Sequence, residues 1–252
     1  MTAIRMTGGP LPPLRALRYL ALGDSYTIGE GVGPAGRWPV QLAHALRAEG
    51  VMLGDPKIVA ATGWTTDELA AALDAFDASH TAVHVPVGAA SAAGCSDSAE
   101  DQGLAAEAAP TTAEPPRWDF VSLLIGVNDQ YRGRGLDAYR AGFAGLLARA
   151  IDYARGRADR VLVLSIPDWG VTPFASREGR DGAQVARELD ACNASAREAC
   201  DRHGVAFVDV TAASRELGAA PGMLADDGLH PSAAMYAAWV RLVLPVARGL
   251  LA

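Results

Sequence analysis

Short apolar runs alternate with longer amphipathic stretches along most of the chain. The apolar runs are often β-branched, which is typical of buried strands. They fall at residues 18–22, 57–60, 120–125, 161–166 and 205–210. The amphipathic stretches predict helices at residues 38–49, 66–76, 136–155, 183–203 and 231–250, the last beginning with a proline at a helix-start position.

This alternation predicts an α/β fold. Strands that alternate with helices join through right-handed crossovers, which produce a parallel sheet with helices on both faces. In such a sheet the ligand binds outside the carboxyl ends of the strands. The residues that directly follow each predicted strand are therefore the first candidates for chemistry.

The length and apolar content favour one domain that covers residues 1–252. A chain of 252 residues, half of them apolar, can bury most of the surface that its unfolded form exposes. We expect residues 1–13 to form a flexible tail. Residues 88–116 are rich in Ala, Ser, Gly, Glu and Pro and predict a long loop insertion, either a surface excursion or a mobile cover over the site.

The net charge and the cysteines indicate which class of partner and which cellular compartment to expect. The net charge of -7 and the absence of a long Lys/Arg run argue against a nucleic-acid partner and favour a small-molecule one. We expect no secretory signal and no membrane span. The three cysteines do not suggest a disulfide framework, because Cys192 and Cys200 would lie about 12 Å apart along one helix. A cytoplasmic location fits these features.

Ser25 is the candidate nucleophile. It follows the first predicted strand in the sequence Gly23-Asp24-Ser25, so it sits on the turn where the chain leaves the sheet. A nucleophile on that turn can face the ligand crevice. A serine in this position is also a common helix N-cap, so the position alone does not establish catalysis.

A serine hydroxyl needs a base, and the base needs a carboxylate to orient it. Asp227 and His230 supply both within one loop before the last predicted helix. Taken alone, this loop is also compatible with a helix-entry turn capped by an aspartate. The remaining histidines have ordinary structural explanations; they are His44, His80, His84 and His203.

Two further turns provide candidate oxyanion donors. Gly63 follows the second predicted strand, and Asn128 follows the third. An Asn side chain and a backbone amide at a glycine can stabilise the oxyanion of a tetrahedral intermediate, and glycine lets the backbone approach the substrate closely. Singly, each residue is more often just part of a tight turn.

Together, these four turns resemble the SGNH, or GDSL, hydrolase family. The family blocks are a GDS near the amino terminus, a glycine in the second block, a GxND and a carboxyl-terminal DxxH, and all four occur here in order. The resemblance runs from about residue 20 to the carboxyl end, outside residues 88–116. It implies a flavodoxin-like three-layer α/β/α sandwich with a five-stranded parallel sheet.

The same resemblance implies a serine hydrolase of carboxylic esters that needs no cofactor or metal. It assigns Ser25 as nucleophile, His230 as base and Asp227 as the acid that orients it. Ser25, Gly63 and Asn128 would form the oxyanion hole. The family includes esterases, thioesterases, lysophospholipases, carbohydrate deacetylases and some acyltransferases, so fold and triad do not name the substrate.

We expect a short-chain acyl ester as substrate, with a carbohydrate O-acetyl group as the main rival. Four aromatic residues follow strand ends, where an acyl or alcohol group would bind, although loop packing explains them equally well. They are Trp64, Tyr131, Trp169 and Phe174. The physiological ester, the balance of hydrolase and acyltransferase activity, and the oligomeric state stay open.

Three other classes of protein fit the sequence less well. The α/β-hydrolases use a GxSxG elbow, whereas Thr27 stands where that motif needs its second glycine. Residues 31–36, GVGPAG, match the dinucleotide fingerprint but do not follow a strand directly, as a phosphate-binding turn must. A noncatalytic binding module on the same fold is disfavoured because every catalytic position is filled.

A metal site is also disfavoured. His80 and His84 have a spacing that can bind a metal, and Cys95 is not far away. No further carboxylate or thiolate cluster completes a tetrahedral set, so we interpret this segment as one that carries two ordinary histidines.

Overall fold

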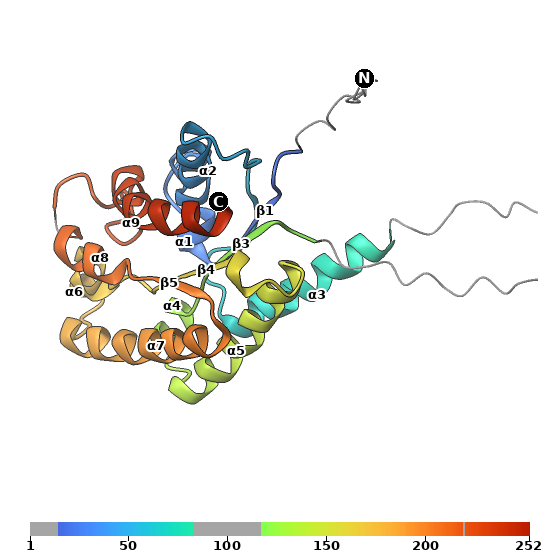
Figure 1. Ribbon diagram of the computed structural model, residues 1–252. Helices are drawn as coiled ribbons and strands as arrows, with labels where there is room; N and C mark the ends of the chain where they lie inside the picture. The colour runs from blue at the N-terminus through green and yellow to red at the C-terminus, as the bar shows by residue number, and fades with distance from the viewer. Residues whose placement is uncertain (1–14, 83–116, 219) are drawn as a thin grey trace, which may run out of the picture.

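The computed structural model describes residues 15–82, 117–218 and 220–252 (Figure 1). The predicted tail at residues 1–13 and the predicted insertion at residues 88–116 lie outside the described residues.

The described residues form a five-stranded sheet in the order β2-β1-β3-β4-β5, in which every neighbouring pair is parallel. This is the flavodoxin-like order, in which the strand order reverses beside the first strand. Each strand lies within the run that the apolar pattern predicts or extends it by one residue. The strands are β1 (Tyr19–Gly23), β2 (Lys57–Ala60), β3 (Phe120–Leu124), β4 (Val161–Leu164) and β5 (Ala206–Val208).

The central strands are buried throughout, and the edge strands are not. Every residue of β1, β3 and β4 is buried, whereas β2 and β5 keep partly exposed positions. Burial on both faces explains why the central strands are continuous apolar runs rather than alternating ones.

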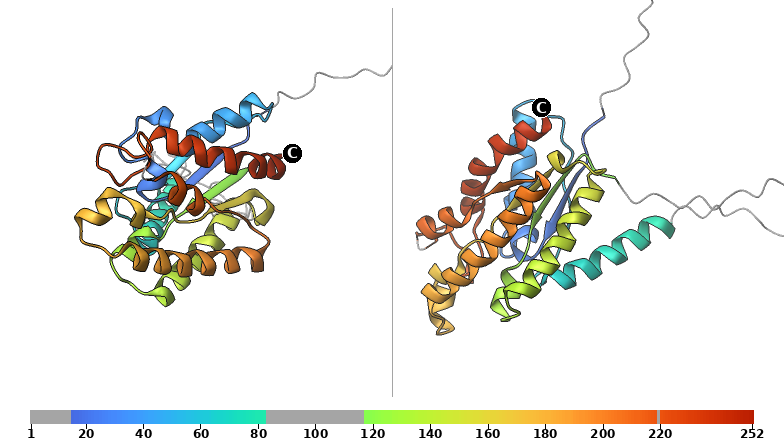
Figure 2. Two further views of the ribbon diagram at one scale, coloured as in Figure 1. Left: turned by 90° about the vertical axis from the view of Figure 1, so that its left-hand side faces the viewer. Right: turned by 60° about the horizontal axis from the view of Figure 1, so that its bottom comes forward.

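Helices cover both faces of the sheet, which gives the predicted three layers (Figure 2). On one face, α2 (Trp38–Ala48) packs beside α9 (Ala233–Leu251). On the other face, α5 (Leu136–Tyr153) lies between α3 (Thr66–Ala82) and α7 (Gly182–His203). Free thiols of Cys192 and Cys200 are buried along α7, and Cys95 lies outside the described residues.

The last helix differs from the prediction at its start and in its character. Ser232 is its N-cap, because its hydroxyl accepts a hydrogen bond from the Met235 N–H, so Pro231 precedes the helix instead of opening it. Within the described residues, α9 alone is long and apolar enough by length and composition to cross a membrane, a property that the sequence analysis missed. Its buried side chains, such as those of Tyr236 and Trp239, pack in the core as in the core helix of a globular domain.

Four short helices that the apolar pattern does not predict follow the strands. The first two begin within three residues of a strand end and connect the sheet to the site. Residues 31–36 come after the first of these helices, so no strand leads directly into them. The helices are α1 (Ser25–Ile28), α4 (Val127–Tyr131), α6 (Pro173–Arg177) and α8 (Thr211–Leu217).

Candidate active site

A cavity of about 180 Å³ lies at the carboxyl ends of β1, β2 and β3. Its lining brings together four of the five residues predicted to carry the chemistry: Ser25, Gly63, Asn128 and His230. No carboxylate is among the described residues that line it. The other lining residues are Tyr26, Thr62, Val127, Tyr131, Trp169, Phe174 and Leu229.

Ser25 is the first residue of α1, directly after β1. Asp24, not Ser25, is the N-cap, and its carboxylate accepts a 3.0 Å hydrogen bond from the Tyr26 N–H. The N–H groups of a first helical turn have no acceptor inside the helix. The Ser25 amide at this position is therefore suited to stabilise an anion beside its own hydroxyl.

His230 and Asp227 form a hydrogen-bonded pair. Asp227 Oδ2 lies 2.5 Å from His230 Nδ1, which leaves Nε2 of the ring to act as a base. Asp227 Oδ1 accepts hydrogen bonds from the backbone N–H groups of Leu229 and His230, at 2.8 and 3.0 Å. Burial raises the pKa of Asp227, but these hydrogen bonds outweigh it and the pKa is lowered overall, which keeps the carboxylate charged.

The ring of Tyr26 packs against the His230 imidazole. The two ring centroids are 5.9 Å apart in an edge-to-face arrangement, and Trp239 supports Tyr26 from 6.1 Å. His230 is buried, so its orientation is fixed on one side by an aromatic ring and on the other by Asp227.

Gly63, from the loop after β2, and Asn128, from helix α4, line the same cavity. Gly63 has a φ of 86°, which favours glycine over any other residue. Asn128 Nδ2 donates a 2.9 Å hydrogen bond to the Trp64 carbonyl, so its second amide hydrogen is available to an oxyanion.

Helix α4 and the residue after it hold the Gly63 loop in place. Asp129, buried on α4, accepts hydrogen bonds from the N–H and hydroxyl of Thr66 at 2.9 and 2.8 Å. Arg132 donates to the Gly63 carbonyl at 2.6 Å and to Glu68 at 3.1 Å. Polar contacts on both sides of Gly63 thus hold the loop after β2 against helix α4.

Asp24 lies fully buried beneath the nucleophile. Burial, aided by the nearby charge of Asp129, raises the pKa of Asp24 to about 7, although the hydrogen bond from the Tyr26 N–H opposes the shift. Among the described residues, no partner contacts its Oδ2 atom. A protonated Asp24 costs less in this apolar setting than a charged one.

Three of the four predicted substrate-binding aromatics form one wall of the cavity. The Trp169 ring lies 5.5 Å from Tyr131 and 6.1 Å from Phe174, centroid to centroid, and its indole N–H donates to Gln130 at 2.8 Å. Trp64 does not line the cavity. Its side chain packs against the core instead, and its carbonyl accepts the bond from Asn128.

Several residues of the site were not predicted from the sequence. Tyr26 and Leu229 line the cavity, and their only sequence signal is that they adjoin Ser25 and His230. Arg132 holds Gly63, and Arg177 of α6 donates a 2.5 Å bond to the Asp227 carbonyl. No sequence pattern marks these arginines, because their partners are distant in the chain.

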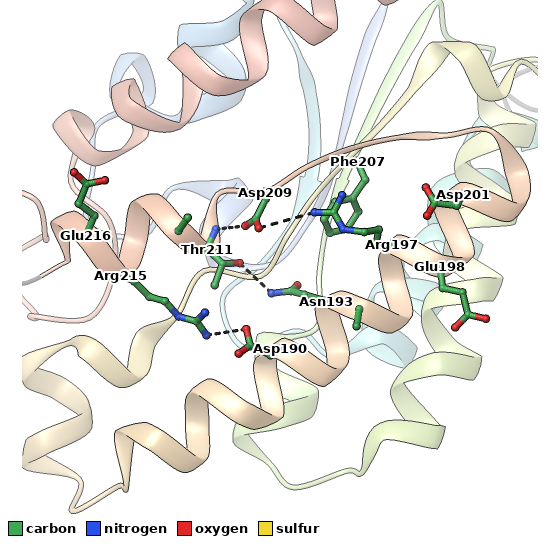
Figure 3. Close-up of a pocket in the computed structure, with 12 residues that line it drawn as sticks. Asp190, Asn193, Arg197, Glu198, Asp201, Phe207, Asp209, Thr211, Arg215 and Glu216 are labelled. Carbon is green, nitrogen blue, oxygen red and sulfur yellow. Dashed lines mark hydrogen bonds and ion pairs between the residues drawn. The ribbon is translucent and has the colours of Figure 1, made fainter.

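A larger cavity of about 830 Å³ lies between α7 and the β5–α8 connection (Figure 3). Figure 3 shows Arg197 directed at Asp209 and Arg215 at Asp190, so its arginines are already paired with carboxylates. It contains none of the predicted triad or oxyanion residues. The predicted triad and oxyanion residues are instead found at the smaller cavity.

Of the three residues of the metal alternative, which the sequence disfavours, the structure describes His80 alone. His80 lies near the end of α3, where its ring packs on Phe76 and its Nδ1 contacts the Phe76 carbonyl at 2.8 Å. His84 and Cys95 lie outside the described residues. Within residues 15–82, 117–218 and 220–252, no group of three or more His, Cys, Asp or Glu side chains is placed to hold a metal.

Comparisons with solved structures find the same fold in known hydrolases. Structures titled TesA and a variant of Axe2, an acetyl xylan esterase from Geobacillus stearothermophilus, each match at 20% identity over 92% of this chain with a TM-score of 0.59. The matches cover 99% and 94% of those chains. A lipolytic protein of the G-D-S-L family from Veillonella parvula matches at 14% identity, over 91% of this chain and 97% of its own, with a TM-score of 0.58.

A search among curated proteins finds no match. The profile of the GDSL-like lipase/acylhydrolase family matches residues 21–238, a span that contains all four sequence blocks. With the fold, this match establishes the protein as a carboxylic ester hydrolase. The chain belongs to the GDSL-like lipase/acylhydrolase family.

Proposed function

We propose that this protein hydrolyses short-chain acyl esters through an acyl-enzyme intermediate on Ser25. The observation that carries the proposal is the shared cavity of Ser25, Gly63, Asn128 and His230, with Asp227 bonded to the far side of the imidazole. Nucleophile, base, orienting acid and oxyanion donors are the parts that acyl transfer requires.

In the first half-reaction the Ser25 hydroxyl attacks the ester carbonyl while His230 Nε2 accepts its proton. The oxyanion accepts hydrogen bonds from the amides of Ser25 and Gly63 and from Asn128 Nδ2. Collapse of the intermediate expels the alcohol, which takes the proton back from His230. In the second half-reaction His230 deprotonates a water molecule, which attacks the acyl-enzyme and releases the acid.

The size of the cavity favours a short acyl group. About 180 Å³ is less than the several hundred Å³ that pockets for drug-sized ligands enclose. The aromatic wall of Tyr131, Trp169 and Phe174 supplies apolar surface for a few methylene groups. A long fatty acyl chain would extend beyond this enclosure into solvent.

The first test is the nucleophile. Ser25→Ala should fold normally but lose nearly all hydrolysis of aryl acetate and all labelling by a fluorophosphonate probe. Ser195→Ala is a matched control, because Ser195 is a buried serine on α7 outside the cavity, and its hydroxyl accepts one long hydrogen bond, of 3.3 Å, from Arg140. Full labelling of the Ser25→Ala variant would assign the nucleophile to another residue.

The second test is the substrate. Aryl esters of increasing acyl length should be hydrolysed best at two to four carbons, with a steep decline beyond the enclosed volume. Acetylated sugars, acyl-CoA and lysophospholipids tested beside them distinguish a carbohydrate O-deacetylase, a thioesterase and a lysophospholipase. A maximum at long chains would contradict the proposal.

A further inference from the structure

Two arginines lie on the outer side of the aromatic wall. The guanidinium carbon of Arg180 lies 5.0 Å from the centre of the Tyr131 ring and 6.0 Å from that of Trp169. Arg177 lies 6.0 Å from the Phe174 ring centre and donates to the Asp227 carbonyl. The positive charges therefore border both the substrate cavity and the triad loop.

Both guanidinium groups have hydrogen-bond donors to spare. Arg180 donates one long bond of 3.3 Å to the Tyr131 carbonyl, and Arg177 donates one bond to the Asp227 carbonyl. A guanidinium carries five N–H donors, so most remain available. When it lies against an aromatic face, its edge still points N–H groups away from the ring and toward solvent.

Neither arginine forms an ion pair with another described residue. Glu188 accepts hydrogen bonds from Gln130 and Gln184 at 2.7 and 2.8 Å, which lower the pKa of its carboxyl. The charge of Arg180 lowers this pKa further, but the two groups form no ion pair. Glu178 lies between the two arginines in sequence and is exposed at the end of α6. By contrast, Arg132 on the opposite side of the site is paired with Glu68.

The described lining of the cavity contains no carboxylate, and the charged carboxylate of Asp227 is bonded to His230 behind that lining. In a chain with a net charge of -7, two arginines without an ion-pair partner among the described residues thus stand beside an uncharged aromatic wall. Arginine guanidinium groups in such a setting bind carboxylate and phosphate groups through paired hydrogen bonds.

We infer that Arg177 and Arg180 form an anion subsite, and that the preferred substrates are esters that carry a carboxylate or phosphate a few bonds from the scissile carbonyl. The inference rests on the proposed esterase function and adds the charge class of its substrate. Arg177 also supports the triad loop, so Arg180 is the cleaner probe of the subsite.

The experiment compares esters that differ in charge but hardly in shape. The first pair is 4-acetoxybenzoate and its methyl ester, and a 4-acetoxyphenyl phosphate with its dimethyl ester forms the second pair. We expect the wild-type enzyme to show a higher kcat/KM for the anionic member of at least one pair. The pair with the larger preference identifies the carboxylate or the phosphate as the natural group.

Variants then assign the preference to the subsite. Arg180→Gln should reduce the ratio of anionic to neutral kcat/KM by about tenfold, the effect of losing one charge-assisted contact at an exposed site. Arg180→Lys should restore part of it. Arg187→Gln is the matched control, because it removes the same charge from an exposed position outside the cavity and should leave the ratio unchanged.

The preference should also weaken as ionic strength rises, since exposed charges are screened. An equal ratio in wild type and Arg180→Gln, or an equal effect of Arg187→Gln, would overturn the subsite. If the neutral esters are hydrolysed in a Ser25-dependent way, such a result leaves the proposed function intact.

Binding separates the subsite from catalysis. In Ser25→Ala, titration with 4-acetoxybenzoate and its methyl ester, followed by tryptophan fluorescence, should give tighter binding of the anion that Arg180→Gln abolishes. Anion binding without any ester hydrolysis by the wild type would support the subsite and contradict the proposed function.

Discussion

The guanidinium of Arg132 donates a 2.6 Å hydrogen bond to the carbonyl oxygen of Gly63, across 69 positions of sequence. The same guanidinium binds Glu68, whose carboxylate accepts a hydrogen bond from the Thr65 N–H at 2.9 Å. Arg132 therefore connects both sides of the loop that carries Gly63, the second predicted oxyanion donor. A displaced Gly63 peptide would misalign its amide from the oxyanion.

We predict that Arg132→Ala lowers kcat on a neutral aryl ester by about tenfold with little change in KM, because the oxyanion forms only in the transition state. Arg132→Lys should recover part of the loss. Arg157→Ala is the control, since Arg157 forms an exposed ion pair with Asp159 outside the site. Equal kcat values for the Arg132 and Arg157 variants would limit Arg132 to a surface role.

Asn128→Ala should lower kcat by roughly 10²- to 10³-fold, as for the loss of one oxyanion donor. The side chain also donates to the Trp64 carbonyl, so the variant releases the Gly63 loop as well. Steady-state kinetics with a thermal melt of each variant separates catalysis from folding. A decrease of less than tenfold would assign Asn128 to the turn alone.

Two adjacent aspartates, Asp226 and Asp227, are the candidates for the acid that orients His230. Asp227 contacts His230 Nδ1, whereas the Asp226 side chain forms no hydrogen bond or ion pair with another described residue. Asp227→Asn should reduce kcat with little effect on KM, since the acid fixes the tautomer and stabilises the imidazolium. The loss should be smaller than for His230→Ala, and Asp226→Asn should have little effect when assayed at the same pH. A more damaging Asp226→Asn would reassign the acid.

The buried carboxyl of Asp24 predicts a pH-dependent stability. Its folded pKa of about 7 exceeds the unfolded value, so between about pH 4 and 7 the folded state binds more protons than the unfolded one. The contribution of Asp24 to the free energy of unfolding is then greatest below about pH 4. It falls as pH rises to 7, by up to about 1 kcal/mol per pH unit.

Asp24→Asn keeps the acceptor for the Tyr26 N–H and cannot ionise. Urea unfolding at pH 5 and 8 should show that the variant gains stability relative to wild type at the higher pH. A difference between the two proteins that is independent of pH would mean that Asp24 titrates alike in both states.

The long elements of this fold could be predicted from the sequence, and the short ones could not. Buried strands such as β3 are continuous apolar runs, and α7 repeats its apolar face over 22 residues. By contrast, α1 has four residues and α4 five, too few to display a helical period. Their caps and loop contacts create them, and those depend on the rest of the fold.

The same distinction applies to the site. Ser25, Gly63, Asn128 and the DxxH pair lie in local motifs at strand or loop ends, and the structure brings the first three and His230 to one cavity. Their catalytic roles remain predictions. Trp64 was expected to line this cavity because it adjoins Gly63. The Trp64 side chain, which follows the left-handed turn at Gly63, packs on the core and is not part of the cavity lining. Adjacency in sequence does not determine the direction of a side chain.

Asp227 and His230, the predicted acid and base, lie on one loop, where the Asp227 carboxylate is bonded to both the ring and the backbone N–H of His230. This loop is attached to α6 through the Phe174 N–H, which donates to the Gly228 carbonyl at 3.1 Å, and through Arg177. Ser25 lies on a separate element, as the first residue of α1 directly after β1. A displacement of α6 that moves the loop of residues 227–230 would therefore change the separation of the imidazole from the Ser25 hydroxyl while the bond between Asp227 and His230 stays intact. A ligand that shifts α6 would act on turnover through that separation.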